Sequence, residues 1–572
     1  MRTRTHLALA CLAILLAAAD TYVVVLALPD MMVSVGLDID ELQRAAPIIS
    51  GFLLGYIAML PLIGRLSDLV GRTPVLVASV VLFGLGSLVT AAAYDLPLVV
   101  AGRFLQGVGG GGLVPATLAL VADLWPPDRR GLPLGVVGAV QELGSVIGPL
   151  YGALVLLLAD WRMIFWINLA CGVVLAWALW RMHPRPTGVQ NVDLAGAALA
   201  LLALTSLTLA LTAPEPLASD VMLGLAFVPL TDRATSHLLT PIGVATLLFA
   251  VAFVLRQITA SRPLVDLRKA VVLTRRVDFP GAVLLGLALS GIVLAFSVAD
   301  PATEVLSPAG PWLLGGSVVA GGSFVVWQRR SEHPIVPRGS LTAPAAWGAL
   351  VVSLLIGAAL IVALVDVPIF ARTTVFPDSQ FGAALVLLRF LVALPVGALL
   401  GGWLSRRIPP APLAAAGMVL AAGGFAVMAS WPHDALVSVT SDVTLLTCGL
   451  GFGLAVAPVN TALLQATPAE SHGIASALVV VARMVGMLVG LSALTVIALR
   501  RFFVRQSQIP PPESLCPDSP AACPAYTEAL RDAALLQLHT TFAGAATCAA
   551  LAGGVALLAL RRTLRLRLAA ER

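Results

Sequence analysis

The side chains of this sequence that could do chemistry are charged groups that fall inside, or at the edge of, long apolar segments. Burial in a medium of low polarity favours the neutral form of an acid, whereas a neighbouring guanidinium favours the carboxylate. A movement that makes or breaks such a pair would therefore change proton affinity and link proton uptake to conformation. The groups concerned are three acids and three arginines: Asp20, Glu142, Asp366, Arg103, Arg389 and Arg483.

Glu142 lies in the apolar segment 132–159. At about 1.5 Å per residue, that segment is long enough to cross a hydrocarbon core of roughly 30 Å. Three glycines and a proline, which let helices approach closely or bend, follow Glu142 in the same segment. These are Gly144, Gly148, Pro149 and Gly152. One interpretation is a proton-sensitive element of a moving transporter, and the other is a glycine-packed structural span with a neutralised or paired acid.

The composition indicates a membrane protein. Of 572 residues, 59% are hydrophobic and 11% are charged, and the mean hydropathy is +0.96. Soluble domains carry roughly 25% charged residues. The net charge of +5 comes almost wholly from arginines in short loops, because Lys269 is the only lysine. This pattern does not suggest a nucleic-acid partner.

Sixteen segments are candidate membrane spans. The first, 7–28, follows a basic start and so imitates a secretory signal, but its apolar character resumes after Asp20 and Thr21, which favours a full-length span. The others are 45–63, 74–93, 98–124, 132–159, 161–180, 194–211, 238–255, 280–298, 312–327, 345–370, 381–404, 411–430, 443–466, 473–504 and 526–560.

These spans predict an all-α integral membrane protein with two six-helix bundles joined by four linker helices. We place the first bundle at residues 1–182, the linker helices at 183–342, the second bundle at 343–562 and a basic tail at 563–572. With a cytoplasmic amino terminus, twenty-four of the thirty-five basic residues fall on the cytoplasmic side. The positive-inside rule then places both termini in the cytoplasm, with the tail against anionic headgroups.

Two internal repeats support this division. The stretch that begins at Val192 recurs 85 residues later at Val277, which indicates a tandem duplication of a two-helix hairpin; chance likeness of leucine and alanine runs is the alternative. A longer repeat relates PATLALVADLWPPDRRG from Pro115 to PVNTALLQATPAESHG from Pro458. It places Arg483 within one position of the equivalent of Glu142. Two homologous halves around a central cavity are typical of secondary transporters.

The loop GRLSDLVGR between the second and third spans resembles the signature loop of the major facilitator superfamily. Its family residues are Gly64, Arg65, Asp68, Gly71 and Arg72. The run GRFLQG, with Arg103 and Gly107, resembles the fourth-span motif of the drug:proton antiporters, and GSVIGPLYG resembles their antiporter motif. ADWRMIFWIN from Ala159 resembles the fourteen-helix branch. The resemblance implies the major facilitator fold, with fourteen spans as the fallback if the extra hairpin does not cross the membrane.

A narrower resemblance is to the actinobacterial exporters of triacylglycerol and related lipids, which work beside a lipid-carrying lipoprotein. It is carried by ADTYVVV from Ala19, QELGSVIGPLYG from Gln141, LVDVPIF from Leu364, LVALPVGALLGGW from Leu391 and GIASALVVVARMVGML from Gly473. Val24 and Val25 stand where drug antiporters tend to carry an asparagine. The extra hairpin is a second departure from the fourteen-helix branch.

The superfamily arrangement places the fifth span of one half beside the second span of the other. It therefore implies an ion pair between Glu142 and Arg389, and the pair Asp20 with Arg483 is a weaker expectation. The alternative is that these charges form static ion pairs or solvated cavity walls. Arg103 could equally hold helix packing.

The last two spans, 473–504 and 526–560, are longer than a bilayer requires, so we expect both to project on the outer side. A tilted helix is the alternative. Cys516 and Cys523 share the polar loop between them, and an oxidising exterior would favour a disulfide over free thiols.

The sequence therefore predicts proton-coupled export of lipids or other lipophilic compounds across a bacterial plasma membrane. A broad drug:proton antiporter, a membrane sensor and a scaffold are the alternatives. We expect a monomer without metal or cofactor, driven by the proton gradient, with an extracytoplasmic lipoprotein as partner. GVGGGG from Gly107 has the spacing of a dinucleotide fingerprint, but it lies in an apolar helix, so close helix contact is the better account.

Overall fold

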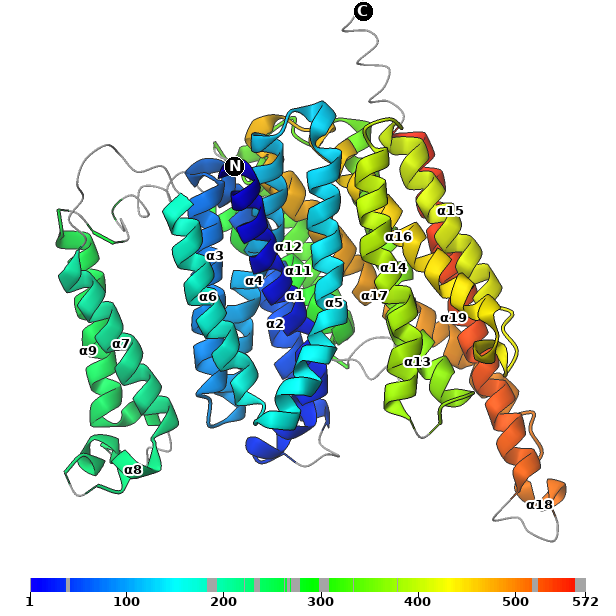
Figure 1. Cartoon of the computed structure of the whole chain (residues 1–572), viewed down its shortest axis with the longest axis horizontal. Helices are drawn as coiled ribbons and strands as arrows, with labels where there is room; N and C mark the ends of the chain where they lie inside the picture. The colour runs from blue at the N-terminus through cyan, green and yellow to red at the C-terminus, as the bar shows by residue number, and fades with distance from the viewer. Residues whose placement is uncertain are drawn as a thin grey trace, which may run out of the picture.

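Long apolar helices make up almost all of the computed structural model of the chain (Figure 1). The structure describes residues 2–37, 42–182, 193–220, 222–230, 237–261, 263–264, 268, 278–297, 308–332, 334–377, 379–516 and 523–560, and no strand occurs among them. Sixteen helices in these ranges are long and apolar enough to cross a membrane. This confirms the predicted number of spans. The expected basic tail at 563–572 and the repeat starts at Val192 and Val277 lie outside the described residues.

The first bundle is built around α4, which packs against α2 and α3. Its glycines allow this, because a Cβ at Gly107 would lie 2.1 Å from the carbonyl oxygen of Phe52, and one at Gly109 would lie 2.3 Å from the backbone nitrogen of Phe83. The glycine run that imitates a dinucleotide fingerprint is therefore a helix contact, as expected. The bundle comprises α1 (Arg2–Ser34), α2 (Leu42–Val70), α3 (Arg72–Ala91), α4 (Leu96–Leu124), α5 (Gly131–Leu158) and α6 (Arg162–Met182).

The second bundle has an aromatic core. The rings of Phe390, Phe425 and Phe452 make edge contacts with centroids 5.9 Å apart, and Phe542 stacks 6.4 Å from Phe425. These residues come from four different helices, so the cluster fixes the packing of the bundle. The helices are α13 (Pro344–Thr373), α14 (Gln380–Leu404), α15 (Pro410–Met428), α16 (Val439–Ala466), α17 (His472–Gln506) and α19 (Pro524–Ala559).

The two bundles meet along α5 with α14 and along α2 with α17. Contact is closest near the first residues of α5 and α17. A Cβ at Gly131 would lie 2.7 Å from the carbonyl oxygen of Gly402, and one at Gly64 would lie 2.7 Å from that of Gly473. Helix α1 begins and α19 ends at this same end of the molecule, the upper end in Figure 1. The structure is therefore closed at the end that carries both termini.

The linker forms two hairpins with different neighbours. Helices α7 (Leu194–Thr212) and α9 (Pro241–Thr259) pack on each other and touch α3 only slightly, and Figure 1 shows them standing beside the first bundle. Helices α11 (Phe279–Ser297) and α12 (Gly310–Arg330) also pair, but α11 lies against α2 and α17. The second hairpin thus covers a seam between the bundles. Short helices follow α7: α8 (Glu215–Ala218), η3 (Gly224–Phe227) and η4 (His237–Leu239).

Both hairpins are capped in the same way. Asp193 accepts a hydrogen bond from the Gly196 backbone and forms an ion pair with Arg256 near the end of α9. In the second hairpin, Asp278 accepts from the Gly281 backbone and from Trp327 Nε1 near the end of α12. Arg256 and Trp327 each lie three residues before the last residue of their helix. A tandem duplication would produce this shared geometry.

Helices α17 and α19 are unusually long, with 35 and 36 residues. At about 1.5 Å per residue each exceeds 50 Å, against roughly 30 Å of hydrocarbon. The lower end of α19 reaches beyond the other helices in Figure 1, next to the short helix α18 (Pro512–Leu515). Cys516 and Cys523 are joined there by a disulfide. The two helices therefore project as a pair on the side opposite to the closed end.

Candidate functional site

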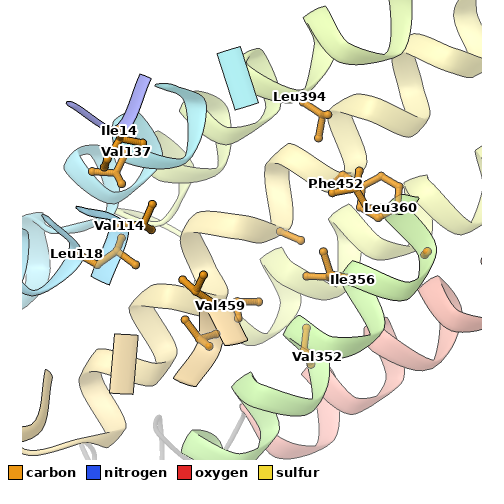
Figure 2. Close-up of a cluster of buried hydrophobic side chains, with 14 of the residues drawn as sticks. Ile14, Val114, Leu118, Val137, Val352, Ile356, Leu360, Leu394, Phe452 and Val459 are labelled. Atoms are coloured by element: carbon orange, nitrogen blue, oxygen red, sulfur yellow. The ribbon is translucent and has the colours of Figure 1, made fainter. Parts of the chain in front are cut away.

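A central cavity of about 70 Å³ lies between the two bundles. Its walls are mostly apolar and include Ile14 and Val114 from the first bundle and Leu360 from the second. Figure 2 shows these three in one cluster of buried apolar side chains. The charged groups on the cavity wall are Glu142 and Arg483. The cavity is thus an apolar space with one acid and one base.

Glu142 and Arg483 form an ion pair across the two bundles. The distance from Arg483 Nη1 to Glu142 Oε1 is 3.5 Å, and the two side chains are 7% and 10% exposed, respectively. Glu142 lies eleven residues after Gly131, the first residue of α5, and Arg483 lies eleven residues after His472, the first residue of α17. The pair therefore joins equivalent positions of the two halves, and it is the one buried charge contact between bundles among the described residues near the cavity.

The expected pair of Glu142 with Arg389 is wrong. Arg389 forms its ion pair with Asp442 of α16, and both side chains are more than one third exposed. Both residues belong to the second bundle. The physical reason is that α14 presents Arg389 toward α16 rather than toward the cavity, although α14 itself packs against α5. Sequence reasoning missed Asp442, whose signal was an acid near the start of an apolar span.

Asp20 is held inside the first bundle, so the expected pair of Asp20 with Arg483 is also wrong. Its carboxylate accepts hydrogen bonds from Arg103 Nη1 at 2.5 Å and from Asn168 Nδ2 at 2.6 Å. Gln106 accepts from Arg103 at 2.9 Å and donates to Ser87 at 2.9 Å. The guanidinium of Arg103 also lies 4.5 Å from the centre of the Phe52 ring. This network neutralises a fully buried charge with partners from its own bundle.

Asn168 and Gln106 were not identified from the sequence as site residues. Gln106 lies within the GRFLQG run and Asn168 at the end of ADWRMIFWIN. The available signal was a polar side chain inside an apolar span, because such a group needs a partner when water is absent.

Asp366 is buried in α13 at 5% exposure, and it does not line the central cavity. Its Oδ2 has no hydrogen-bond partner among the described residues. No arginine in these ranges forms an ion pair with it. The structure thus separates Asp366 from the two buried arginines with which it was grouped.

The motif at residues 64–72, which the structure places in the last turns of α2, at Gly71 and at the start of α3, ties the closed end together. Asp68 accepts hydrogen bonds from the backbone of Gly473 at 2.8 Å and of Ile474 at 3.1 Å, at the start of α17, and it also pairs with Arg72. A carboxylate is favoured at a helix amino terminus. Arg72 further contacts Asp123 at 3.1 Å. Gly71 has a φ of +101°, a conformation that favours glycine.

Arg65 and Gly64 of the same motif lie within α2 at this junction. Gly64 faces Gly473, and Arg65 Nε is buried without a hydrogen-bond partner among the described residues. The motif therefore connects the two bundles, because Asp68 binds the start of α17 while Arg72 binds Asp123 of α4.

The antiporter motif packs α5 against α1. A Cβ at Gly144 would lie 2.4 Å from that of Ala18, and one at Gly152 would lie 2.3 Å from the side chain of Val23. Gly148 and Pro149 lie within the same helix. This close seam lies one turn from Glu142, so a bend at Pro149 would move the outer part of α5 relative to the cavity.

Comparison with known proteins agrees with this architecture. The sequence model of the Major Facilitator Superfamily matches residues 10–328 and 270–491. A protein named triacylglyceride transporter from Mycolicibacterium hassiacum is 38% identical over 502 residues, which are 86% of this chain and 78% of that protein. A triacylglyceride transporter of Mycobacterium tuberculosis strain H37Rv is 37% identical over 515 residues, covering 87% of this chain and 83% of that protein.

Solved structures share the fold at low identity. The proton:xylose symporter XylE, bound to 6-bromo-6-deoxy-D-glucose, aligns with a TM-score of 0.55 at 13% identity over 96% of this chain and 94% of that one. The human organic anion transporter MFSD10 aligns with a TM-score of 0.52 at 16% identity, over 98% and 99%. The fold, the duplicated halves and the curated relatives lead to one assignment. The chain belongs to the major facilitator superfamily and is a multi-pass membrane transporter.

Proposed function

We propose that this transporter exports triacylglyceride-like lipids or other lipophilic compounds across a bacterial plasma membrane, coupled to proton entry. The observation that carries the proposal is the apolar cavity between the bundles, crossed by the buried pair Glu142–Arg483. The names of the curated relatives supply the cargo class.

The cavity walls suit a cargo with few polar groups. Apart from Glu142 and Arg483, the polar side chains on the wall are Gln141, Tyr56 and Thr21. Its volume of about 70 Å³ is well below the roughly 300–1,000 Å³ of pockets for drug-sized ligands, so the cavity has to widen as the bundles move before it can hold a cargo molecule. In the widened cavity, a lipid with three long chains would place its ester core between the bundles and keep its tails between helices or in the bilayer.

Proton coupling would act through the cross-bundle pair. While Glu142 is ionised, its attraction to Arg483 holds the bundles together at mid-depth. A proton on Glu142 removes that attraction, because Arg483 cannot lose its own charge. The bundles can then rock, and release of the proton on the other side restores the pair.

The arrangement of arginines suggests the orientation. The closed end carries Arg65, Arg72, Arg129, Arg130, Arg406 and Arg407. Under the positive-inside rule this end faces the cytoplasm, so both termini are cytoplasmic and the structure is closed to the cytoplasm. The α17–α19 projection then lies outside, where an extracytoplasmic lipoprotein would collect the cargo.

A broad drug:proton antiporter is the second candidate, and it is favoured by Glu142, because this acid lies on the wall of a mostly apolar cavity and could attract an apolar cation. Purified protein in proteoliposomes distinguishes the two. A pH gradient should drive fluorescent triacylglyceride to an acceptor on the far side, while an apolar cationic dye should move little. Movement of the dye alone would support the antiporter, and movement of neither would contradict both proposals and indicate a sensor or scaffold.

A further inference from the structure

A second groove, separate from the central cavity, lies between the projecting parts of α17 and α19. It has a volume of about 850 Å³, and residues 430–433, which follow α15, form its base. The base is fixed, because His539 Nε2 lies 2.8 Å from the carbonyl oxygen of Trp431 and the Trp431 ring packs against Phe370. The groove is therefore a built feature of this end of the second bundle.

The two walls of the groove have opposite character. On α17 the wall carries Arg500, Arg501 and Arg505, and residues four apart lie on one helix face. On α19 the wall carries Leu535 and Leu536, and also Asp532 and His539, which are bonded to His433 and to the Trp431 carbonyl oxygen, respectively. A molecule that fits both walls has an anionic group at one side and an apolar chain at the other.

The three guanidinium groups have no bonded counter-charge in the part of the chain that the structure describes. None of Arg500, Arg501 and Arg505 has a hydrogen bond or ion pair through its side chain to another described residue. The one acid of the groove, Asp532, is bonded to His433 at 2.8 Å. Like charges four residues apart destabilise a helix, so an arginine cluster of this kind favours an external anion.

The depth of the cluster points to a lipid. Arg500 lies twenty-eight residues after the first residue of α17, or about 42 Å along the helix, beyond roughly 30 Å of hydrocarbon. The arginines would therefore lie at the level of the headgroups opposite to the closed end. Arginine clusters outside are unusual under the positive-inside rule.

We propose that this groove binds the phosphate of an anionic phospholipid, with an acyl chain against Leu535 and Leu536. The site goes beyond the transport of an uncharged lipid, which carries no phosphate, and it does not depend on proton coupling. Phosphate groups suit arginine because a guanidinium offers two parallel donors.

Binding of short-chain lipids to the purified full chain in detergent tests the proposal. Dioctanoyl phosphatidylglycerol should bind, and affinity should fall as salt rises. Arg501→Gln/Arg505→Gln should weaken binding at least tenfold, because each basic residue near a headgroup contributes about 1 kcal/mol. The matched control Arg406→Gln/Arg407→Gln removes two exposed arginines at the opposite end and should leave affinity within about twofold.

Two further variants and two further ligands complete the binding experiment. Asp532→Asn removes the competing carboxylate and should tighten binding, which tests the site even where the double arginine variant folds poorly. Glu142→Gln should bind phosphatidylglycerol normally, so failure of transport and failure of this site remain distinguishable. Equal binding of phosphatidylcholine, or of inorganic phosphate at the same concentration, would overturn the proposal, as would equal losses in the two double variants.

Discussion

Two buried carboxylates of this molecule differ in where their partners lie, because one is bound within its own bundle and the other is bound to the opposite bundle. Asp20 is bound by Arg103 and Asn168 from its own bundle, so movement of one bundle against the other leaves these bonds intact. Glu142 is bound by Arg483 of the opposite bundle. Only the second contact would have to break if the bundles rock, which is why we propose Glu142 as the proton-coupling residue.

Glu142→Gln and Arg483→Leu should behave differently although they break the same contact. Glu142→Gln leaves Arg483 charged and buried without the carboxylate of its ion pair, whereas in Arg483→Leu the Glu142 carboxylate can take up a proton and become neutral. We expect both variants to lose proton-driven transport by at least tenfold, and Glu142→Gln to unfold at the lower temperature in detergent. Proton-dependent transport at the wild-type rate by Glu142→Gln would contradict the assignment.

Asp20→Asn should destabilise the first bundle. The Asp20 and Arg103 side chains are 0% and 2% exposed, and breaking a buried pair by removing one charge costs about 3–5 kcal/mol. The matched control is Asp128→Asn, because the pair of Asp128 with Arg129 is 68% and 76% exposed and such pairs contribute about 0–1 kcal/mol. Thermal unfolding in detergent compares the two variants, and similar unfolding temperatures would refute a buried, charge-bearing network.

At the scale of elements, hydropathy predicts the helices well and their rotations poorly. A span must form its backbone hydrogen bonds internally and cover the hydrocarbon, so a long run of apolar residues is enough to predict it. Helix α14 is apolar around its whole circumference, so nothing in its sequence marks which face carries Arg389 toward α16. The internal repeat predicted the partner of Glu142 better than hydropathy did, because it placed Arg483 at an equivalent position of the second half.

The two linker hairpins offer a matched comparison, because they share a capping geometry but not an environment. Asp278→Ala and Asp193→Ala each remove an amino-terminal cap, which costs about 1 kcal/mol. Helix α11 lies against α2 and α17, whereas α7 and α9 contact mainly each other. We therefore expect Asp278→Ala to lower transport several-fold and Asp193→Ala to leave it unchanged in the proteoliposome assay. Equal effects would show that the second hairpin has no special role at the seam.

For the whole molecule, the closed end is one of the two states that alternating access requires. It is held by apolar contact of α5 with α14 and by the bonds of Asp68 to the start of α17. Within the contact of α5 with α14, Gly138 lies about two turns after the start of α5 and faces Ala398. Transport in this scheme needs these helices to part.

A disulfide across this seam should stop transport reversibly. A Cβ at Gly138 would lie 3.7 Å from that of Ala398, within the roughly 3.5–4.5 Å of a disulfide. In a background with Cys11, Cys171, Cys448 and Cys548 replaced by alanine, oxidation of Gly138→Cys/Ala398→Cys should reduce transport at least tenfold, and reduction should restore it. The control Gly321→Cys/Ala288→Cys, with 3.9 Å between the same atoms, joins α12 to α11 within one hairpin. Its oxidation should leave transport intact, because it restrains no movement between the bundles. Full transport by the oxidised first pair would exclude rocking at the seam of α5 with α14.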